Sequence, residues 1–347
     1  MKTIRVGING FGRIGRSFFR IAHGRPEIDI VAVNDLGDIE NAAYLLQYDS
    51  VYGKAPFSVS VRSDEKPAII VDGNKEIVFV SEKDPAHLPW GELAVDVVVE
   101  STGVFTSYEK SRPHLVAGAK RVVISAPVKD EPPTDLKGAT VLLGVNDHLL
   151  EACDISSNAS CTTNSASPVM QILDETIGVE KAMLSTVHGY TASQSLVDGP
   201  SKRDFRAGRA AAQNIIPSST GAAVAVTKAI PSLLDKFDGI AMRVPVVAGS
   251  IADITFLARR ATTVEEVNNL LEKGAADDRW KPVFAVTRDP IVSTDILGAR
   301  QASIVDLSLT RVVDGDLVKV CAWYDNEAGY THSLVEHVIK TGGYVIR

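Results

Sequence analysis

Apolar residues recur in short runs at regular intervals through the first half of the chain. Residues 4–9 are apolar at alternate places, and an amphipathic helical pattern follows them to Ala22. Further short apolar runs, each ending in polar or glycine-containing turns, occupy 28–33, 95–99, 121–124 and 140–143. The stretch 57–80 alternates instead and predicts a small antiparallel excursion. Strands that alternate with helical spans predict an α/β fold with a mostly parallel, doubly wound sheet.

The pattern changes after residue 161. Strands are predicted at 181–187, 240–245, 253–258, 303–310 and 317–324. They are long and rich in β-branched residues, which predicts a mainly antiparallel sheet. A capping box at Thr263–Glu266 predicts a helix. We therefore expect two domains, at 1–160 and 161–325, the second of the α+β class. Apolar residues at helical spacing near the end predict a C-terminal helix, 326–347, that packs back onto the first domain.

Composition narrows the classes of protein that need to be considered. The 347 residues suit two domains, and 36 basic against 43 acidic residues give a net charge of −7, which argues against a primary role in binding nucleic acid. No stretch is apolar for long enough to span a membrane. Three cysteines make neither a disulfide framework nor, with histidine, a metal site. We expect a cytoplasmic globular protein without a bound metal.

A glycine motif lies between the first strand and the first helix. Gly10, Gly12 and Gly15 form the pattern G-x-G-x-x-G, in which the glycines allow a tight turn, a close approach of the backbone to a pyrophosphate and close helix packing. Asp35 follows Gly15 by 20 residues, where a carboxylate hydrogen-bonds the ribose of NAD and repels the 2′-phosphate of NADP. The sequence therefore predicts a Rossmann-type domain that binds NAD.

Cys161 lies among small polar residues between a predicted strand at 154–157 and a predicted helix at 168–176. A thiol near a helix N-terminus is expected to have a lowered pKa. His188 follows the predicted strand 181–187. A cysteine and a histidine that are distant in sequence form a candidate nucleophile and base if the fold brings them together.

These features occur together in one known family. The sequence resembles phosphorylating glyceraldehyde-3-phosphate dehydrogenase over nearly its whole length. The matching segments are Asn9–Arg16, Glu100–Gly103, Ser157–Asn164, His188–Thr191, Ile215–Ala223, Met242–Pro245 and Trp323–Glu327. The resemblance implies that 1–160 is the NAD-binding domain and 161–325 the catalytic domain. It also implies a homotetramer.

The resemblance assigns roles to individual residues. Cys161 corresponds to the nucleophile, which forms a thiohemiacetal and then a thioester, and His188 to the base. The residues that correspond to cofactor contacts are Gly10, Gly12, Arg13, Ile14, Gly15, Asp35, Lys83, Ser125 and Asn326. Those that correspond to contacts with substrate or inorganic phosphate are Ser160, Thr162, Thr191, Thr220, Gly221 and Arg243. Either Arg206 or Arg209 corresponds to a further anion-binding arginine.

The implied reaction is the NAD-dependent oxidation and phosphorylation of glyceraldehyde 3-phosphate to 1,3-bisphosphoglycerate. Erythrose-4-phosphate dehydrogenase is the alternative within the same class of enzyme. A binding protein that keeps the fold without turnover, responding to NAD or binding RNA, is the alternative from another class. Every position with a chemical role in the family carries a matching residue here, and the net charge is negative. Both observations disfavour the binding protein.

Overall fold

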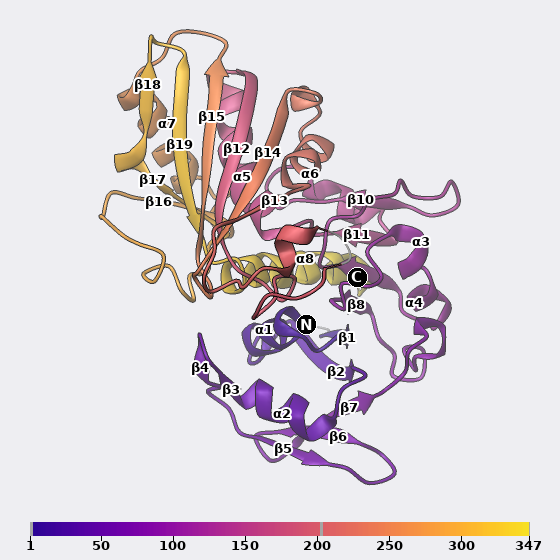
Figure 1. The fold of residues 1–347 in the computed structure, drawn as a ribbon. Coiled ribbons are helices and arrows are strands. Elements are labelled where there is room, and N and C mark those ends of the chain that lie inside the picture. Colours follow the sequence, from indigo (N-terminus) through magenta and orange to yellow (C-terminus); the bar gives the residue numbers. More distant parts are fainter. Residues whose placement is uncertain (1–2, 202–203, 347) are drawn as a thin grey trace. The chain divides into compact units, whose positions relative to one another are not determined.

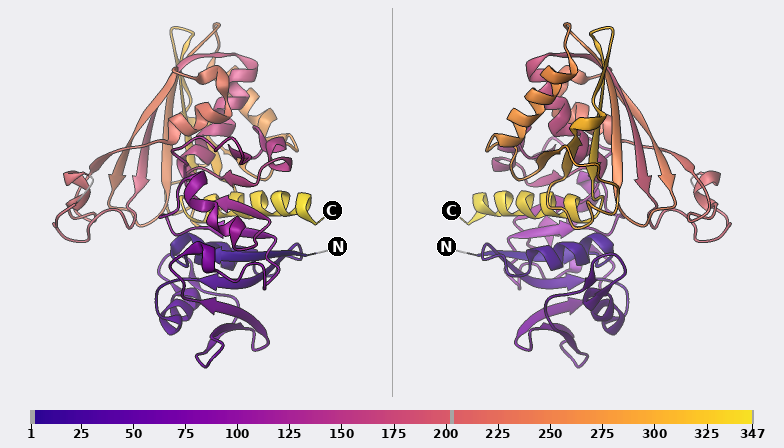
Figure 2. Two further views of the ribbon diagram at one scale, coloured as in Figure 1. Left: turned by 90° about the vertical axis from the view of Figure 1, so that its right-hand side faces the viewer. Right: turned by 90° about the vertical axis from the view of Figure 1, so that its left-hand side faces the viewer.

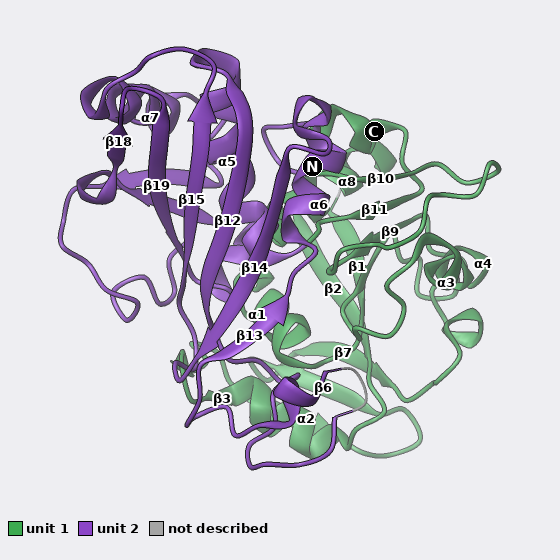
Figure 3. Cartoon of the chain, turned by 45° about the horizontal axis from the view of Figure 1, so that its top comes forward, with its two compact units in different colours: residues 1–141, 147–159, 334–347 green, residues 142–146, 160–333 purple. Residues whose placement is uncertain are grey.

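The computed structural model describes residues 3–201 and 204–346, which group into two compact units (Figure 3). The first unit comprises the described residues of Met1–Val141, Asp147–Ala159 and Leu334–Arg347. The second comprises Leu142–Asn146 and the described residues of Ser160–Ser333. The ends of the expected ranges, residues 1 and 347, lie outside the described residues. No helix in the described part of the chain is long and apolar enough to cross a membrane.

The first unit is built on a nine-stranded sheet (Figure 1). Its strands in spatial order are β10 (Gly138–Thr140), β11 (Ile155–Ser157), β9 (Arg121–Ile124), β8 (Val97–Glu100), β1 (Ile4–Asn9), β2 (Ile28–Asn34), β7 (Lys75–Val80), β6 (Ala68–Val71) and β5 (Val59–Arg62). Pairing is parallel from β10 to β7. Strand β1 lies between β2 and β8, so the order of the strands changes direction at β1. Crevices for ligands form at such a change of direction, beyond the carboxyl ends of the strands.

Helices and shorter elements connect these strands. They are α1 (Arg13–Ala22), α2 (Ile39–Gln47), β3 (Tyr48–Asp49), β4 (Gly53–Lys54), η1 (Pro85–His87), α3 (Tyr108–Ser111), α4 (Pro113–Val116) and η2 (Asp147–Glu151). The apolar side chains of the strands form a buried core in which Trp90, Val98 and Ile124 are fully covered. Burial of this kind stabilises a sheet by roughly 25 cal/mol per Å² of apolar surface.

Two expectations for this half of the chain need adjustment. The stretch 57–80 does turn back antiparallel through β5, β6 and β7, but β7 pairs in parallel with β2, so the excursion extends the main sheet. The strand expected at 140–143 is wrong, because β10 ends at Thr140. Beyond it the Leu142 amide donates to the Asn146 side chain at 2.8 Å and the Leu142 carbonyl accepts from the Asn146 amide. The apolar run therefore forms a buried turn.

The second unit contains an eight-stranded, mainly antiparallel sheet. Its order is β13 (Ile216–Ser219), β14 (Phe237–Val244), β12 (Val179–Gly189), β15 (Ser250–Ala258), β19 (Leu317–Tyr324), β17 (Ser303–Asp306) and β16 (Phe284–Thr287), with β18 (Arg311–Val313) beside β19. The pairs β12–β14 and β16–β17 are parallel. The strand expected at 303–310 stops at Asp306, because the Asp306 carboxylate caps η5 (Leu307–Leu309). The other single turns are η3 (Phe205–Gly208) and η4 (Pro231–Leu233).

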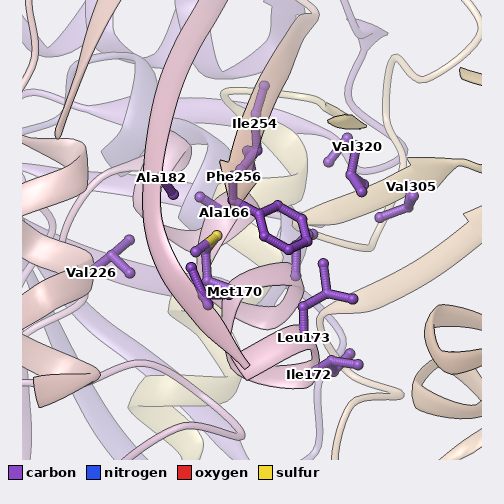
Figure 4. Packing of buried hydrophobic residues seen from close by; sticks show 14 of the residues in the cluster. Ala166, Met170, Ile172, Leu173, Ala182, Val226, Ile254, Phe256, Val305 and Val320 are labelled. Atoms are coloured by element: carbon purple, nitrogen blue, oxygen red, sulfur yellow. The ribbon is translucent and has the colours of Figure 1, made fainter. Parts of the chain in front are cut away.

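Helices α5 (Cys161–Thr176), α6 (Ala222–Ala229) and α7 (Val264–Ala276) lie on one face of this sheet (Figure 2). Met170 and Leu173 of α5 are fully buried in a cluster that includes Phe256 of β15 (Figure 4). Along β12 the side chains alternate, so that Leu184, Thr186 and His188 are buried whereas Met183 and Val187 are exposed. His188 therefore points to the face of the sheet that the helices cover.

Helix α8 (Ala328–Val345) is divided between the two units at residue 334. Its part from Leu334 onward groups with the first unit, where Val335 and Val338 are buried. His337 of this part donates from Nδ1 to Asn158 Oδ1 at 3.0 Å, and its Nε2 accepts from Ser156 Oγ at 2.8 Å. The preceding turn of the helix groups with the second unit.

Candidate functional site

The glycine loop joins the carboxyl end of β1 to α1 at the centre of the parallel sheet. Gly10 has φ +93°, and a Cβ there would lie 2.6 Å from the backbone nitrogen of Thr102. A Cβ on Gly15 would lie 2.1 Å from the Gly10 carbonyl oxygen, whereas one on Gly12 would meet no atom within 4 Å. Gly10 and Gly15 therefore serve the packing of the loop, and the backbone at Gly12 faces open space, as a pyrophosphate requires.

A pocket of about 810 Å³ opens beside this loop in the first unit. It is lined by Asn9, Gly10, Gly12, Asn34, Asp35, Leu36, Glu82, Lys83, Asp84, Pro85, Ser101, Thr102, Val104 and Phe105. The Asp35 carboxylate accepts from the amides of Phe11 at 2.7 Å and Gly37 at 2.8 Å, which fixes the acid at the end of β2. The size of the pocket and its glycine-lined wall fit part of a dinucleotide.

Other expected cofactor contacts have different surroundings. Arg13, at the start of α1, pairs with Asp49 at 3.0 Å. Ile14 follows it in the same turn, and Lys83 lines the pocket. Ser125 comes directly after β9 in the first unit, whereas Asn326 belongs to the second, where its side-chain oxygen accepts from the Gly249 amide and the Ser250 hydroxyl.

A buried polar network behind the pocket was not expected from the sequence. Glu100 Oε2 accepts from Asn9 Nδ2 at 2.6 Å and from His114 Nε2 at 3.1 Å, while its Oε1 accepts from the amide and hydroxyl of Thr102. His114 Nδ1 accepts in turn from Trp90 Nε1 at 3.0 Å. This carboxylate is therefore well satisfied, and it fixes two residues that line the pocket, Asn9 and Thr102.

Cys161 is the first residue of α5, so the helix begins before the expected start at Pro168. The Ser160 hydroxyl caps the helix by accepting from the Thr163 amide at 3.1 Å. The small polar residues that obscured the helical pattern are buried here, Thr163 and Ser165 completely. Cys161 therefore lies at a helix N-terminus, where free amides and the dipole favour negative charge.

The thiol and the imidazole meet inside the second unit. Cys161 Sγ lies 3.4 Å from His188 Nε2. The parallel register of β12 and β14 pairs His188 with Arg243 and brings Arg243 Nη1 to 2.6 Å from His188 Nδ1. The Gly189 carbonyl oxygen also lies 2.6 Å from Nδ1. A guanidinium can only donate, so Nδ1 accepts from Arg243 in one tautomer and donates to the Gly189 carbonyl in the other. Only in the second tautomer is Nε2 free to accept the proton of the thiol.

Burial dominates the ionisation of this pair. Burial, together with the charge of Arg243, lowers the pKa of His188 to about 3. Burial also raises the pKa of the Cys161 thiol, against the opposing effects of Arg243 and of hydrogen bonds from Thr162 and the backbone. The thiol pKa is therefore raised, not lowered as its position at a helix N-terminus led us to expect, because burial has the larger effect. Burial therefore favours the neutral thiol and the neutral imidazole.

The candidate anion-binding residues lie on several segments of the second unit. The Thr220 hydroxyl accepts from the Ala222 amide at 3.1 Å, and Gly221 begins α6, where a Cβ would meet no atom within 4 Å. Thr191 bonds to Ser193 and Gln194. Arg209 pairs with Asp198 at 3.0 Å, and Arg206 lies in η3. Arg243 is next to the thiol and imidazole, and its Nε has no hydrogen-bond partner within the described chain.

Thr162 has a partner that sequence reasoning missed. Its hydroxyl lies 2.8 Å from the hydroxyl of Tyr324, which in turn lies 2.6 Å from the hydroxyl of Thr186. Tyr324 is 162 positions away in the sequence, and only strand order brings it here. Among the residues that the structure describes, no group of three or more His, Cys, Asp or Glu side chains could hold a metal ion.

Comparison with known proteins agrees with this geometry. Residues 4–108 match the NAD-binding domain of glyceraldehyde 3-phosphate dehydrogenase, and residues 160–326 match its C-terminal domain. Glyceraldehyde-3-phosphate dehydrogenase of Streptomyces coelicolor is 48% identical over 98% of this chain and 99% of that protein. The Geobacillus stearothermophilus enzyme of the same name is 47% identical over 96% and 97% of the two chains. The chain belongs to the glyceraldehyde-3-phosphate dehydrogenase family.

Proposed function

We propose that the protein catalyses the NAD-dependent oxidation and phosphorylation of glyceraldehyde 3-phosphate to 1,3-bisphosphoglycerate. The observation that carries this proposal is the 3.4 Å approach of Cys161 Sγ to His188 Nε2 in the unit that matches the family's C-terminal domain. The glycine loop and Asp35 border the pocket of the unit that matches the NAD-binding domain. Together they supply a nucleophile, a base and a place for the cofactor.

In this proposal Cys161 attacks the aldehyde carbon while His188 accepts the thiol proton. His188 passes that proton to the former carbonyl oxygen, which gives a thiohemiacetal and leaves the imidazole neutral. His188 then takes the proton of the thiohemiacetal hydroxyl, so that the carbon becomes a thioester. NAD, when bound, accepts the hydride that this oxidation releases. Inorganic phosphate attacks the thioester, the acyl phosphate leaves, and the thiol is regenerated.

We propose that Gly10, Gly12, Arg13, Ile14 and Gly15 hold the pyrophosphate part of NAD, with Asp35 at the ribose. Two amides fix the Asp35 carboxylate at the pocket, and Asn34 and Leu36 beside it carry no charge that would attract a 2′-phosphate. Lys83 lies along the same wall. Ser125 and Asn326 are assigned to the nicotinamide end.

We assign two phosphate sites by their chemistry. Arg243 and Thr191 would hold the phosphate of the aldehyde, since a guanidinium can bond to two oxygens at once. Ser160, Thr220 and Gly221 would hold inorganic phosphate, because α6 begins at Gly221, where a Cβ would meet no atom within 4 Å and a helix N-terminus favours negative charge. Thr162 belongs to the same set, and its hydroxyl, like those of Ser160 and Thr220, has a partner within the protein. Which of Arg206 and Arg209 contributes stays open, although Arg209 is already paired with Asp198.

The two phosphate sites can be separated by rapid kinetics. Arg243→Ala should raise the KM for the aldehyde by about tenfold or more and weaken the first burst of NADH. Thr220→Ala should raise the KM for inorganic phosphate and leave that burst nearly intact. If Thr220→Ala abolishes the burst while Arg243→Ala changes only the response to phosphate, the two sites are assigned the wrong way round.

We also propose that the protein is a cytoplasmic homotetramer. The cysteines of the chain, Cys153, Cys161 and Cys321, are all free thiols, as a reducing compartment favours. Exposed Met183, Val187 and Ile240 on the outer face of the second unit's sheet suit burial against other copies. A monomer in sedimentation velocity at micromolar concentration would contradict the assembly.

The direct test of the reaction is the formation of NADH by the purified protein. We expect turnover with glyceraldehyde 3-phosphate, NAD and inorganic phosphate together, and at most one equivalent of NADH per site when phosphate is omitted. Faster turnover with erythrose 4-phosphate would favour erythrose-4-phosphate dehydrogenase instead. Absence of NADH with either aldehyde would contradict both.

A further inference from the structure

One buried carboxylate bonds to residues on two walls of the pocket in the first unit. Glu100 ends β8 and is 2% exposed. Its Oε2 accepts from Asn9 Nδ2 at 2.6 Å and from His114 Nε2 at 3.1 Å. Its Oε1 accepts from the amide of Thr102 at 2.8 Å and from the hydroxyl of the same residue. Asn9 and Thr102 line the pocket, so Glu100 acts on the pocket through both.

The first wall is reached through two asparagines. Asn34 Nδ2 donates to Asn9 Oδ1 at 2.7 Å and to the Glu82 carbonyl oxygen at 2.9 Å, while Asn34 Oδ1 accepts from the Glu82 amide at 2.9 Å. That backbone amide can only donate, so it fixes which end of the Asn34 side chain carries the oxygen. The Asn34 nitrogen must then face the Asn9 oxygen, and the Asn9 nitrogen must face an acceptor. Glu100 Oε2 is that acceptor.

The other partners of Glu100 are donors for equally definite reasons. The Trp90 indole can only donate, so His114 Nδ1 accepts from it at 3.0 Å and the imidazole hydrogen lies on Nε2, toward Glu100. The Thr102 hydroxyl oxygen accepts from the Val104 amide at 3.0 Å and keeps its hydrogen for Glu100. Each of these bonds to Glu100 therefore comes from a donor, and a carboxylate is the side-chain group that only accepts.

We propose that Glu100 is a positioning residue for the cofactor, whose carboxylate holds the two walls of the pocket in the arrangement that binds the adenosine part of NAD. The walls are the pocket residues that its hydrogen bonds connect: Asn9, Asn34 and Glu82 on one side, Thr102 and Val104 on the other. Asp35, the residue assigned to the ribose, lines the same pocket. The inference deepens the proposed function and rests on it only in taking this pocket as the NAD site.

Glutamine has the size of Glu100 but the wrong polarity for this position. If its nitrogen takes the place of Oε2, it faces the Asn9 nitrogen and His114 Nε2. In the place of Oε1 it faces the Thr102 amide. Either orientation leaves opposed donors in a buried site, which is unfavourable unless one wall moves. The exchange of a single group therefore displaces pocket residues, although Glu100 itself need not touch the cofactor.

The test compares the binding of NAD and of ADP-ribose by isothermal titration calorimetry. Glu100→Gln should raise the Kd of both by about tenfold, the usual effect of an unsatisfied buried donor. ADP-ribose lacks the nicotinamide, so an equal factor places the effect away from the nicotinamide end. With NAD saturating, kcat and the KM for the aldehyde should stay within about twofold of wild type, because the thiol and the imidazole belong to the second unit.

Asp96→Asn is the matched control, because Asp96 is a buried carboxylate just before the amino end of the same strand, β8. It accepts from the Arg5 amide at 2.9 Å and pairs with Lys120 at 2.7 Å, at the opposite end of the strand from the pocket. Urea unfolding should show a loss of stability in both variants, whereas only Glu100→Gln should lose affinity for NAD. A merely structural role for Glu100 would instead make affinity fall with stability in both.

A reversed pair tests the polarity itself. Asn9→Asp alone sets two carboxylates against each other and should also weaken the binding of NAD. In combination with Glu100→Gln, the carboxylate at position 9 accepts from the new amide, from Asn34 and from His114, whose Nε2 lies 3.4 Å from Asn9 Nδ2. The double variant should therefore bind NAD more tightly than either single variant.

Three results would overturn the inference. One is a wild-type Kd for NAD in Glu100→Gln. Another is an equal loss of affinity in Glu100→Gln and Asp96→Asn, and the third is a double variant whose loss of affinity is the sum of the two single losses. Binding is measured without turnover, so a failure of the proposed reaction appears separately, as a wild-type protein that binds NAD and forms no NADH.

Discussion

Two histidines, one in each unit, have nearly the same burial but different partners. His188 is 3% exposed and His337 is fully covered. Burial is the main cause that lowers the pKa of each to about 3. Both ring nitrogens of His337 form hydrogen bonds with neutral side chains, those of Asn158 and Ser156. His188 presents Nε2 to a thiol and has a guanidinium beside Nδ1.

The comparison shows that a strongly shifted pKa does not by itself identify a catalytic histidine. Both residues would be selected by burial and by the direction of the shift. The partner atom separates them, because only His188 faces a group that can act as a nucleophile. We therefore assign His337 to the packing of α8 and His188 to the reaction.

The largest effect is expected for the nucleophile. Cys161→Ser should reduce turnover by several orders of magnitude, because a hydroxyl is far less ionised than a thiol and forms no thioester. Cys153→Ser is the matched control, since Cys153 is a buried thiol in the first unit. Steady-state NADH formation measures both. Near-normal turnover in Cys161→Ser would remove Cys161 from the mechanism.

An intermediate effect is expected when the two histidines are changed in the same way. His188→Asn should lower kcat by about 10²–10⁴-fold, the usual contribution of a general base. His337→Asn should leave the kcat per folded molecule within about twofold of wild type, if His337 only packs α8. Active-site titration with iodoacetamide would normalise the two measurements. An equal loss of kcat in both variants would contradict the assignment of His188 to the reaction and of His337 to packing.

The smallest effect concerns stability and its dependence on pH. The folded pKa of His337 is about 3 against an ordinary 6.5, so the unfolded chain binds a proton first as the pH falls. Stability should therefore decrease from pH 6.5 toward pH 3, by up to about 1.4 kcal/mol per pH unit for each such histidine. His337→Asn should flatten this slope in urea unfolding. Parallel wild-type and variant curves would mean that His337 takes up a proton in the folded state.

Sequence reasoning was most effective where the structure is local. The strand, the glycine loop and the helix from Ile4 to Ala22 are contiguous, so their pattern and spacing could be recognised together. The apolar run at 140–143 was misassigned because a side chain of Asn146 decides its conformation. The start of α5 was misplaced because Ser160 caps it within a stretch of small buried residues that shows no helical period.

The chemistry of the site was only partly predictable. Cys161 and His188 could be selected by residue type and position, but the direction of the thiol pKa depends on burial and on Arg243, which strand register brings close. Tyr324 and Glu100 lie in segments that resemble the family, but nothing local in the sequence indicated their partners. Their roles depend on contacts between segments far apart in the sequence, such as the bond between Thr162 and Tyr324.

The most direct test of the central claim is to capture the covalent intermediate on Cys161. The protein would be mixed with NAD and glyceraldehyde 3-phosphate without inorganic phosphate, quenched in acid, and analysed by peptide mass spectrometry. We expect the acyl group as a thioester on the Cys161 peptide, in proportion to the NADH formed, and its loss when phosphate is added before the quench. NADH formation without an adduct on Cys161, or an adduct that phosphate does not remove, would contradict the mechanism.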